Sequence, residues 1–347
     1  MNYRKRSVLF LFPMISMMAI TACHEQSKHP GVDKDEVKTP AQVDEHAGTD
    51  LKSMLQYAAD NGDKLNDSTV LVYRKLADSV YGSNGYTPIW SDKQRWLPAG
   101  DSLLSLIEGC KVYGLFPSDY HYASLSFFRR VIGEDTLARK NAATWNRADL
   151  LLTDAFFMLV KHLRQGRLDY DSVTLRRDSV LPDSFFTRTL ATARQFGVRG
   201  ALDSLEPRHP GYDSLKAYLG AFLAGAHFRK LTWLDYPYKD SAVFYTALTR
   251  RLQEVGYIDS SVTLADTAML ASALRKYQET NKLKVTGKAS QETVTMMDNS
   301  DWEKFKRIAI NLDRYKLLPD TLPRTYVWVD LPAFSLQVRD ADTVALE

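Results

Sequence analysis

The sequence feature that most constrains the fold is a helical spacing of apolar residues, which recurs from Leu51 onward. Apolar residues three and four positions apart form one face of an amphipathic α-helix. The clearest case is 147–164, and Gly166 stands where a helix commonly ends. Its apolar face would comprise Ala148, Leu151, Leu152, Ala155, Phe156, Leu159 and Leu163. Similar patterns cover 70–80, 101–113 and 212–224. Together these patterns predict a mainly α fold.

The spacing changes after Pro323, where apolar and polar residues alternate every second position. This alternation predicts β-strands, which form a hairpin over 325–347 with a turn at 340–342. A few strands rich in Val, Trp and Phe are marginally stable alone and leave apolar edges uncovered. We therefore expect this hairpin to begin a β domain that is incomplete in this chain.

The first residues have the pattern of an export signal. Arg4, Lys5 and Arg6 precede an uncharged stretch over 7–20, which is too short to span a bilayer. The stretch ends at Ile20-Thr-Ala-Cys23, which resembles a bacterial lipobox. We expect a signal peptide over 1–22, a lipid on Cys23, and an exported, membrane-anchored lipoprotein that faces the periplasm. The alternative is an ordinary signal peptide with an incidental cysteine.

Residues 23–50 contain no aromatic residue and few apolar ones, so they predict a flexible tether rather than a packed unit. Three histidines lie in this segment, at His24, His29 and His46. Their spacing is irregular, and we expect no metal site there.

Charge and motifs exclude several function classes. The net charge of +3 is too small to indicate a nucleic-acid partner. The sequence contains no Gly-rich phosphate loop, no paired metal-ligand spacing and no Gly-x-Ser-x-Gly nucleophile motif, so no cofactor or metal is expected. If Cys23 carries lipid, Cys110 is the one remaining thiol and no intramolecular disulfide can form.

Cys110 is the one candidate nucleophile. It shares a helical face with Leu103, Leu106 and Ile107, and free cysteine commonly behaves as a small buried apolar residue. We therefore assign Cys110 to the core rather than to catalysis, and we expect no catalytic residue in this chain. His162 lies beside the apolar face of its helix and is expected to be a cap-region or surface residue rather than a base.

Three short helices over 242–255, 266–281 and 290–297 resemble a peptidoglycan-binding module. The landmarks are Leu248, Leu252 and Gly256-Tyr257, then Ala273 to Gln278, and then Leu283, Thr286-Gly287, Ser290 and Thr293. The resemblance implies peptidoglycan as partner, with Tyr277, Gln278, Gly287 and Thr293 as candidate binding residues. Such modules usually have Phe-Gln and Asp-Gly where this chain has Tyr277-Gln278 and Thr286-Gly287, and the lost acid weakens any inference about ligand contacts.

The whole order of elements resembles the long-type murein L,D-transpeptidases, which join a helical scaffold, a peptidoglycan-binding module and a catalytic β domain. The landmarks are Tyr86-x-Pro88-x-Trp90, Gly114 to Tyr120, 153–169, Glu206 to Tyr212, Asn311 to Tyr315, and 327–336. The resemblance implies a scaffold over 51–238, a module over 241–299, a linking helix over 300–324 and the first strands of a truncated catalytic domain over 325–347.

In this family a histidine and a Ser-x-Gly-Cys motif carry out acyl transfer, in which a cysteine thiolate attacks a peptide donor. This sequence contains neither that histidine nor the Ser-x-Gly-Cys motif. The first hypothesis is therefore the front portion of a peptidoglycan L,D-transpeptidase, inactive alone. The alternative is a non-enzymatic peptidoglycan-binding lipoprotein. A third hypothesis makes the scaffold and module protein-interaction surfaces.

Overall fold

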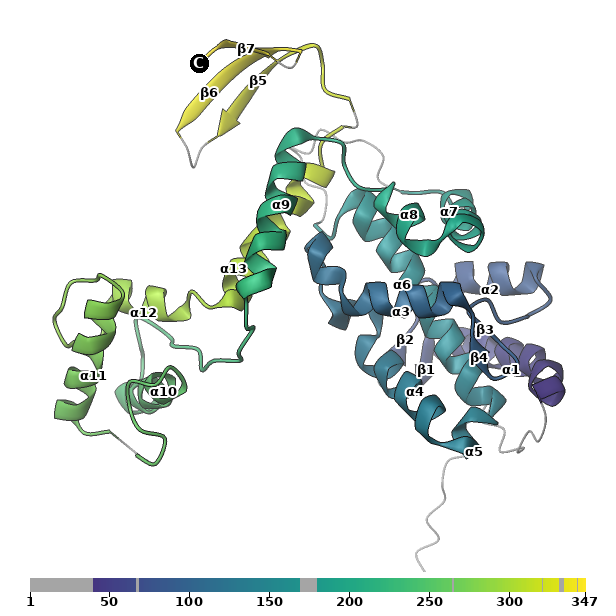
Figure 1. The fold of residues 1–347 in the computed structure, drawn as a ribbon, viewed down its shortest axis with the longest axis horizontal. Helices are drawn as coiled ribbons and strands as arrows, with labels where there is room; N and C mark the ends of the chain where they lie inside the picture. The colour runs from purple at the N-terminus through teal and green to yellow at the C-terminus, as the bar shows by residue number, and fades with distance from the viewer. Residues whose placement is uncertain are drawn as a thin grey trace, which may run out of the picture.

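A computed structural model describes residues 40–66, 69–168, 180–263, 265–319, 321–330, 334–341 and 343–347. The described residues are mainly α-helical, as predicted (Figure 1). The α-helices are α1 (Pro40–Asp60), α2 (Arg74–Ser83), α3 (Pro98–Glu108), α4 (Tyr122–Glu134), α5 (Thr136–Arg139), α6 (Ala142–Gln165), α7 (Asp183–Phe196), α8 (Val198–Asp203), α9 (Pro210–Gly225), α10 (Ser241–Glu254), α11 (Thr267–Thr280), α12 (Gln291–Asp298) and α13 (Asp301–Lys316). Two 3₁₀ helices, η1 (Cys110–Tyr113) and η2 (Pro117–Tyr120), follow α3.

Helix α6 is the centre of the larger body, and helices α1 to α5, α7 and α8 lie around it (Figure 1). Asn141 begins α6, because its side chain accepts a hydrogen bond from the backbone N–H of Thr144 at 3.1 Å. The helix is buried on the predicted apolar face and on most of the opposite face as well. A helix enclosed in this way must satisfy its buried polar groups internally.

Two buried carboxylates of α6 meet this requirement. Asp149 accepts hydrogen bonds from the hydroxyl of Tyr81 at 2.7 Å and from the backbone N–H groups of Ile89 and Trp90 at 2.8 and 2.9 Å. It also accepts one from Ser91 at 3.0 Å, in strand β3 (Ser91–Asp92), which pairs with β4 (Arg95–Trp96). Asp149 thus fixes the segment around Trp90, one of the predicted scaffold landmarks.

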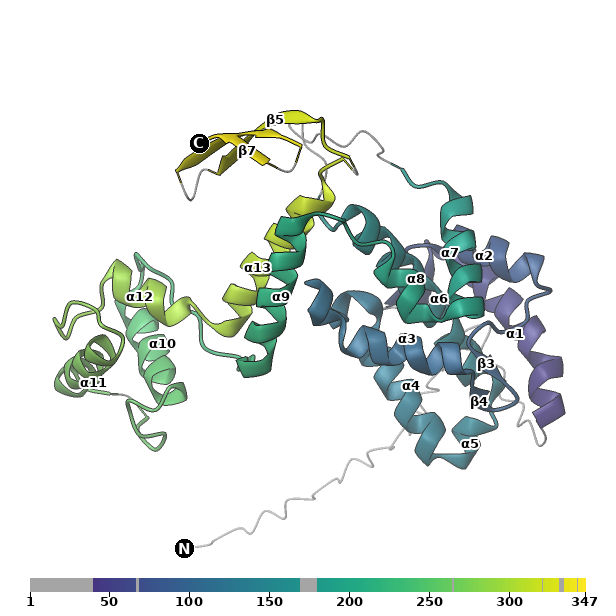
Figure 2. The same ribbon diagram turned by 45° about the horizontal axis from the view of Figure 1, so that its top comes forward.

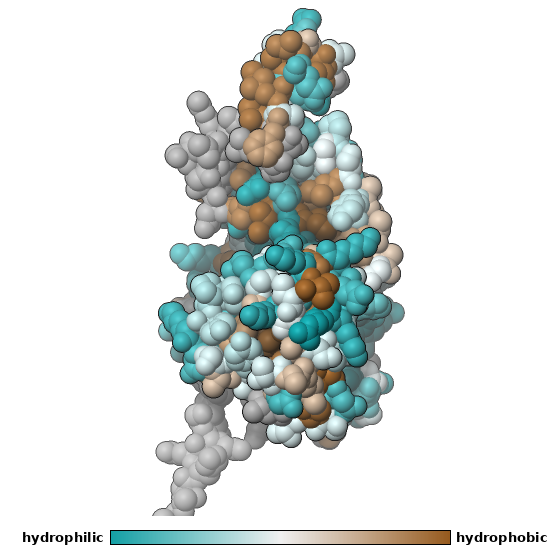
Figure 3. All heavy atoms as spheres, turned by 90° about the vertical axis from the view of Figure 1, so that its left-hand side faces the viewer, coloured by the Kyte–Doolittle hydropathy of each residue, from teal (hydrophilic) through white to brown (hydrophobic). Residues whose placement is uncertain are grey.

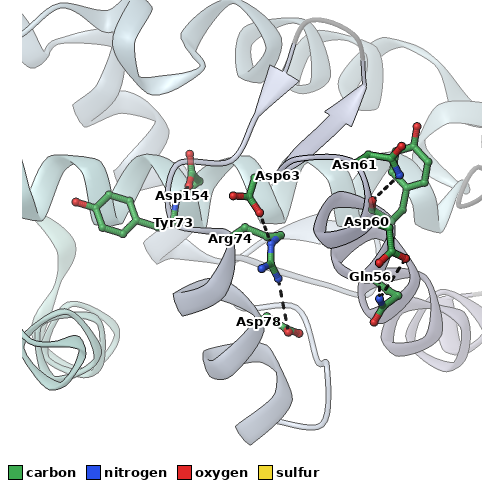
Figure 4. Close-up of polar contacts among 9 residues, drawn as sticks. Gln56, Asp60, Asn61, Asp63, Tyr73, Arg74, Asp78 and Asp154 are labelled. Carbon is green, nitrogen blue, oxygen red and sulfur yellow. Dashed lines mark hydrogen bonds and ion pairs between the residues drawn. The ribbon is translucent and has the colours of Figure 1, made fainter.

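Asp154 fixes the start of α2 in the same way. Its carboxylate accepts hydrogen bonds from the backbone N–H of Tyr73 at 2.6 Å and interacts with the ring Nε2 of His121 at 2.8 Å. Figure 4 shows Asp154 beside Tyr73, and Arg74 between Asp63 and Asp78. These contacts hold α2 and the short hairpin of β1 (Lys64–Asn66) and β2 (Thr69–Val70) against the central helix.

The predicted tether is shorter than expected, because α1 already begins at Pro40. Leu51, Leu55 and Ala58 of α1 are buried against the larger body. Once such a packed segment has nucleated a helix, each further residue adds a hydrogen bond at low cost, so the helix extends into polar sequence. Apolar content alone could not reveal that extension.

Two further expectations need correction. The helix predicted over 70–80 begins only at Arg74, because residues 69–70 form β2. The pattern over 212–224 predicts an inward apolar face on α9 that includes Tyr218, but Tyr218 is 62% exposed.

Helices α9 and α13 form an antiparallel pair, which we call the stalk, and both views show them side by side (Figures 1 and 2). At one end the backbone of Gly211 packs on Tyr315 so closely that an added Cβ would lie 2.8 Å from the ring Cζ. At the other end His227 donates its backbone N–H to Asp301 at 3.0 Å. Helix α13 (Asp301–Lys316), within the predicted linking segment 300–324, therefore packs along α9.

The chain leaves the larger body on α9, forms α10 to α12, and returns on α13. The three helices expected for the module are all present, and Asp266 and Ser290, the first residues of two predicted ranges, cap α11 and α12. Their small core includes Phe244, Leu248 and Leu274. Ser300 caps α13, accepting from the backbone N–H of Glu303 at 3.4 Å.

The C-terminal sheet contains three strands rather than a two-stranded hairpin: β5 (Thr325–Asp330), β6 (Ser335–Asp340) and β7 (Thr343–Leu346), all antiparallel. Figure 3 shows hydrophobic side chains gathered on this sheet, above the mostly hydrophilic module. One face is apolar and exposed, and it includes Val327, Val329, Leu336 and Leu346. On the other face Trp328 stacks on His209, with ring centroids 5.6 Å apart.

The signal segment, Cys23 and the tether up to residue 39 lie outside the described residues. Among the residues that the structure describes, no helix is both long and apolar enough to cross a membrane.

Candidate functional site

A pocket of about 290 Å³ lies where the module meets the base of the stalk. Its walls come from α10, α11, α12, the first turn of α13, and the segment that enters the module after α9. The lining residues are His227, Arg229, Leu231, Arg251, Val255, Tyr277, Asn281, Met296, Met297, Asn299, Ser300, Asp301 and Lys304. The pocket therefore includes both segments that connect the stalk to the module: the one that follows α9 and the one that leads into α13.

Arg251 forms the buried wall of this pocket and is only 3% exposed. Its guanidinium donates hydrogen bonds to the carbonyl of Thr232 at 3.0 Å and to the carbonyl of Met297. Burial lowers the pKa of Arg251, whereas the nearby carboxylates of Asp298 and Glu254 favour its charged form. Arg251 thus joins the entering segment to the end of α12 and leaves a positive charge beneath the pocket.

The entering segment is also held by Glu254 at the end of α10. The two carboxylate oxygens of Glu254 accept hydrogen bonds from the backbone N–H and the hydroxyl of Thr232, both at 2.7 Å. Arg229 donates to the carbonyl of Glu254 at 2.7 Å. These contacts fix the backbone of the segment, so the pocket is preformed rather than dependent on a loose loop.

The charge balance of the pocket is positive. Arg229, Arg251 and Lys304 face a single lining carboxylate, Asp301, whose Oδ1 lies 3.7 Å from the Lys304 Nζ. Tyr277 and Asn281 add polar groups, and Met296 and Met297 add flexible apolar surface. A small pocket of this composition suits a carboxylate-bearing ligand with a short apolar part.

The structure brings three of the four predicted binding residues into one buried cluster. The Oε1 of Gln278 accepts from the backbone N–H groups of Thr286 and Gly287, both at 2.9 Å. Its Nε2 donates to the Oγ1 of Thr293 at 3.0 Å and to the carbonyl of Lys288 at 2.9 Å. We call this arrangement the Gln278 clasp. It fixes the loop between α11 and α12.

Gly287 is required by the geometry of that loop. Its φ is +69°, and a Cβ would lie 3.0 Å from the Nε of Arg275 and 3.1 Å from the carbonyl oxygen of Ala271. Gln278 and Thr293 are 0% and 1% exposed, so their described contacts are with the module itself. That these residues bind a ligand remains a prediction.

Tyr277, the fourth predicted residue, lies apart from the clasp on the pocket wall. Its ring packs edge-on against Tyr257, with centroids 5.4 Å apart, and burial raises its pKa to about 12. Sequence reasoning missed Arg229, Arg251 and Lys304. The one available signal was Arg251, a charged residue three positions after Leu248 and therefore on the inward face of α10.

Cys110 is fully buried among the core residues of the larger body, as predicted. Burial raises the pKa of its thiol to about 12. A thiol in this state is protonated at neutral pH and inaccessible, whereas nucleophilic attack needs an exposed thiolate.

His162 lies in the last turn of α6, in the cap region as expected, and is partly buried rather than at the surface. Its Nδ1 lies 2.8 Å from the hydroxyl of Tyr120. Burial, helped by Lys161, Arg167 and Lys316, lowers its pKa to about 3. The described ranges contain no cluster of three or more His, Cys, Asp or Glu side chains that could hold a metal ion.

A larger cavity of about 740 Å³ separates the start of α9 from the C-terminal sheet. Five cationic side chains line it, those of Arg164, Arg208, Lys316, Arg324 and Arg339, and none of its described lining residues is acidic. One of its walls is a sheet whose opposite face is uncovered, so we regard this cavity as a cleft between two parts of the chain.

Comparison with protein families matches two parts of the chain. Residues 75–219 match the family described as a scaffold domain, and residues 244–297 match the putative peptidoglycan binding domain. No curated protein matches the chain. The first match covers α2 to α8 and most of α9, and the second covers the module of α10 to α12. The chain thus combines a scaffold domain with a peptidoglycan-binding domain, in the architecture of the long-type L,D-transpeptidases.

Proposed function

We propose that this protein binds the stem peptides of peptidoglycan in the module pocket and serves cell-wall cross-linking by an L,D-transpeptidase. The observation that carries the proposal is the positive pocket within the peptidoglycan-binding domain. Stem peptides carry several carboxylates, and Arg229, Arg251 and Lys304 supply complementary charge at a preformed site.

The catalytic step is assigned to a β domain that begins with β5 to β7. The exposed apolar face of this sheet, with Val327, Val329 and Leu336, supports the proposal because such a face needs a covering layer. The Trp328 ring on His209 would hold that domain against the stalk. The sequence contains no Ser-x-Gly-Cys motif and Cys110 is buried, so the 347 residues alone should not transfer acyl groups.

Anchoring through Cys23 completes the proposal. A processed lipoprotein carries three acyl chains, which hold a protein firmly on a membrane. The anchor and the segment after it would place the module within reach of peptidoglycan. Replacing Cys23 by Ala should move the protein from the membrane fraction to the soluble fraction, and unchanged fractionation would contradict a lipid at this position.

Binding to purified sacculi tests the proposed pocket. Lys304→Glu reverses an exposed charge in the first turn of α13, where an acidic residue is favourable for the helix. We expect about fivefold weaker binding at low salt, since one exposed ion pair contributes up to about 1 kcal/mol. The matched control is Lys276→Glu on α11, because Lys276 is exposed and does not line the pocket.

The control and wild type should bind sacculi equally, and both should lose affinity as salt rises. Equal binding by wild type and Lys304→Glu would contradict the pocket assignment. Failure of the wild type to bind sacculi under any salt condition would contradict the proposed function as a whole.

The alternative is a non-enzymatic peptidoglycan-binding lipoprotein, with which the buried state of Cys110 is equally consistent. This alternative requires the chain to be soluble and to unfold cooperatively at its 347-residue length. Aggregation, or rapid proteolysis after Tyr326, would instead support the proposal that the sheet needs a further layer to cover its apolar face.

A further inference from the structure

A second surface of the module consists of four aromatic side chains, which we call the aromatic row: Tyr236, Tyr238, Phe244 and Tyr245. They lie in the segment that enters α10 and in its first turn. The row begins before residue 244, where the match to the peptidoglycan-binding family starts. None of its members lines the module pocket.

The rings of the row pack on one another. Tyr238 stacks on Phe244 with centroids 4.5 Å apart and planes 20° apart. Tyr236 and Tyr245 each contact Tyr238 at 6.0 Å between centroids. Phe244 is only 3% exposed and belongs to the module core, so it forms a fixed base under Tyr238.

The outer rings remain open although they are held in place. Tyr238 and Tyr245 are each 39% exposed. Tyr245 also packs edge-on against Phe244, with ring centroids 5.4 Å apart. Rigid aromatic rings lose little conformational entropy when a ligand packs on them, so such rings make effective binding surfaces.

The charge around the row differs from that of the pocket. The charged residues nearest in sequence are Asp235, Lys239 and Asp240, and the side chain of Asp240 is used to cap α10. This balance does not favour the carboxylates of a stem peptide. Amino sugars present apolar C–H faces and polar edges, which suit an aromatic ring with a hydroxyl at its edge.

We propose that the aromatic row is a sugar-stacking surface that binds the glycan strand of peptidoglycan. The proposal rests on the proposed function and adds a second contact to it. The pocket would take a peptide carboxylate, and Tyr238 and Tyr245 would pack on sugar rings. Two contacts on one rigid module would raise the affinity for intact sacculi above that of either part alone.

The test uses the full chain and two separate probes: glycan strands stripped of stem peptides, and free stem peptides. Wild type should bind the stripped strands. Tyr238→Ala and Tyr245→Ala should each weaken that binding by about tenfold, the size expected when a stacking platform loses one ring. Tyr238→Phe keeps the ring and should remain within about threefold of wild type.

The matched control is Tyr218→Ala, which removes a tyrosine on α9 that is 62% exposed and outside the row. It should bind stripped strands as wild type does. Tyr245→Ala guards against misfolding of Tyr238→Ala, because Tyr238 stacks on the core residue Phe244 at 4.5 Å whereas Tyr245 meets it only edge-on at 5.4 Å.

Two results would overturn the proposal. If wild type binds free stem peptides or sacculi but not stripped strands, the aromatic row is not a glycan surface, and the proposed function stands. The same holds if folded Tyr238→Ala and Tyr245→Ala bind stripped strands as tightly as wild type. If wild type binds neither probe and does not bind sacculi, the proposed function fails as well.

Discussion

The larger body and the module each have a helical core, but different interactions stabilise the two cores. The larger body encloses α6 on nearly all sides and buries two carboxylates, Asp149 and Asp154, within its core. The module has a much smaller core and relies on a single buried amide, Gln278, to fix its main loop. Beside buried groups such as Arg251 and Phe244, it carries aromatic side chains that remain exposed, such as Tyr238 and Tyr245.

The difference suggests a division of roles. In the larger body the buried carboxylates accept hydrogen bonds from other core groups, as Asp149 does from Tyr81 and Trp90. In the module Tyr238 keeps exposed surface that a ligand can reach, and so does Lys304 where the stalk meets the module. The comparison predicts that substitutions in the larger body change stability, whereas substitutions on the module surface change binding.

The largest effect is expected from Asp149→Ala. The change leaves the Tyr81 hydroxyl and the N–H groups of Ile89 and Trp90 without their buried acceptor. We expect a loss of about 3–5 kcal/mol in the free energy of unfolding, measured by urea denaturation.

The control for this variant is Asp101→Ala, which removes a surface carboxylate 3.7 Å from Arg129. It should cost less than about 1 kcal/mol. A cost for Asp149→Ala as small as that of the control would show that the buried network does not hold the larger body together.

The next effect is expected in the module. Gln278→Ala leaves the backbone N–H groups of Thr286 and Gly287 unpaired, and it should cost about 2–3 kcal/mol. Hydrogen exchange at the amides of α11 and α12 would measure this loss. Protection of the α6 amides should stay unchanged, and equal loss in both regions would mean that the two cores unfold as one unit.

Acid should act on the two regions in opposite directions. The pKa of His162 is lowered to about 3, so from about pH 6.5 down to that value the unfolded chain binds a proton that the folded chain does not. Acidification therefore destabilises the larger body, by up to about 2 kcal/mol at pH 5. The pKa of Asp298 is raised to about 6, mainly by burial. The folded module then binds the extra proton between about pH 6 and 4, so acidification stabilises it.

Hydrogen exchange at several pH values would separate these two contributions. His162→Asn should remove part of the acid sensitivity of α6, and Asp298→Asn should remove the acid stabilisation of α12. Identical pH profiles for wild type and both variants would contradict the assigned protonation states.

The smallest effect concerns Cys110. In a Cys23→Ala background, a thiol reagent should leave native Cys110 unmodified, because the thiol is buried and its pKa is raised to about 12. Modification should appear only under unfolding conditions. Rapid labelling of the native protein would reopen a catalytic assignment for Cys110.

Much of the fold could be predicted from helical spacing and capping residues. The pattern at 147–164 located α6, and Asp266 and Ser290 located the starts of α11 and α12. The β-strands after Pro323 followed from the change to a two-residue period, although the third strand was missed because 343–346 is too short to show a pattern.

The site was less predictable, because its residues converge only in three dimensions. Arg229, Arg251 and Lys304 lie on three different segments, and no spacing in the sequence relates them. The start of α1 at Pro40 was missed for another reason: a polar stretch became helical by extension from a packed one.

The most direct test of the division between the two regions is hydrogen exchange of the full chain with and without soluble peptidoglycan fragments. Binding should protect amides around 227–231, 233–245 and 296–304, which form the module pocket and the aromatic row, and should leave α2 to α8 unchanged. Protection confined to α2 to α8, with none in the module, would contradict the account.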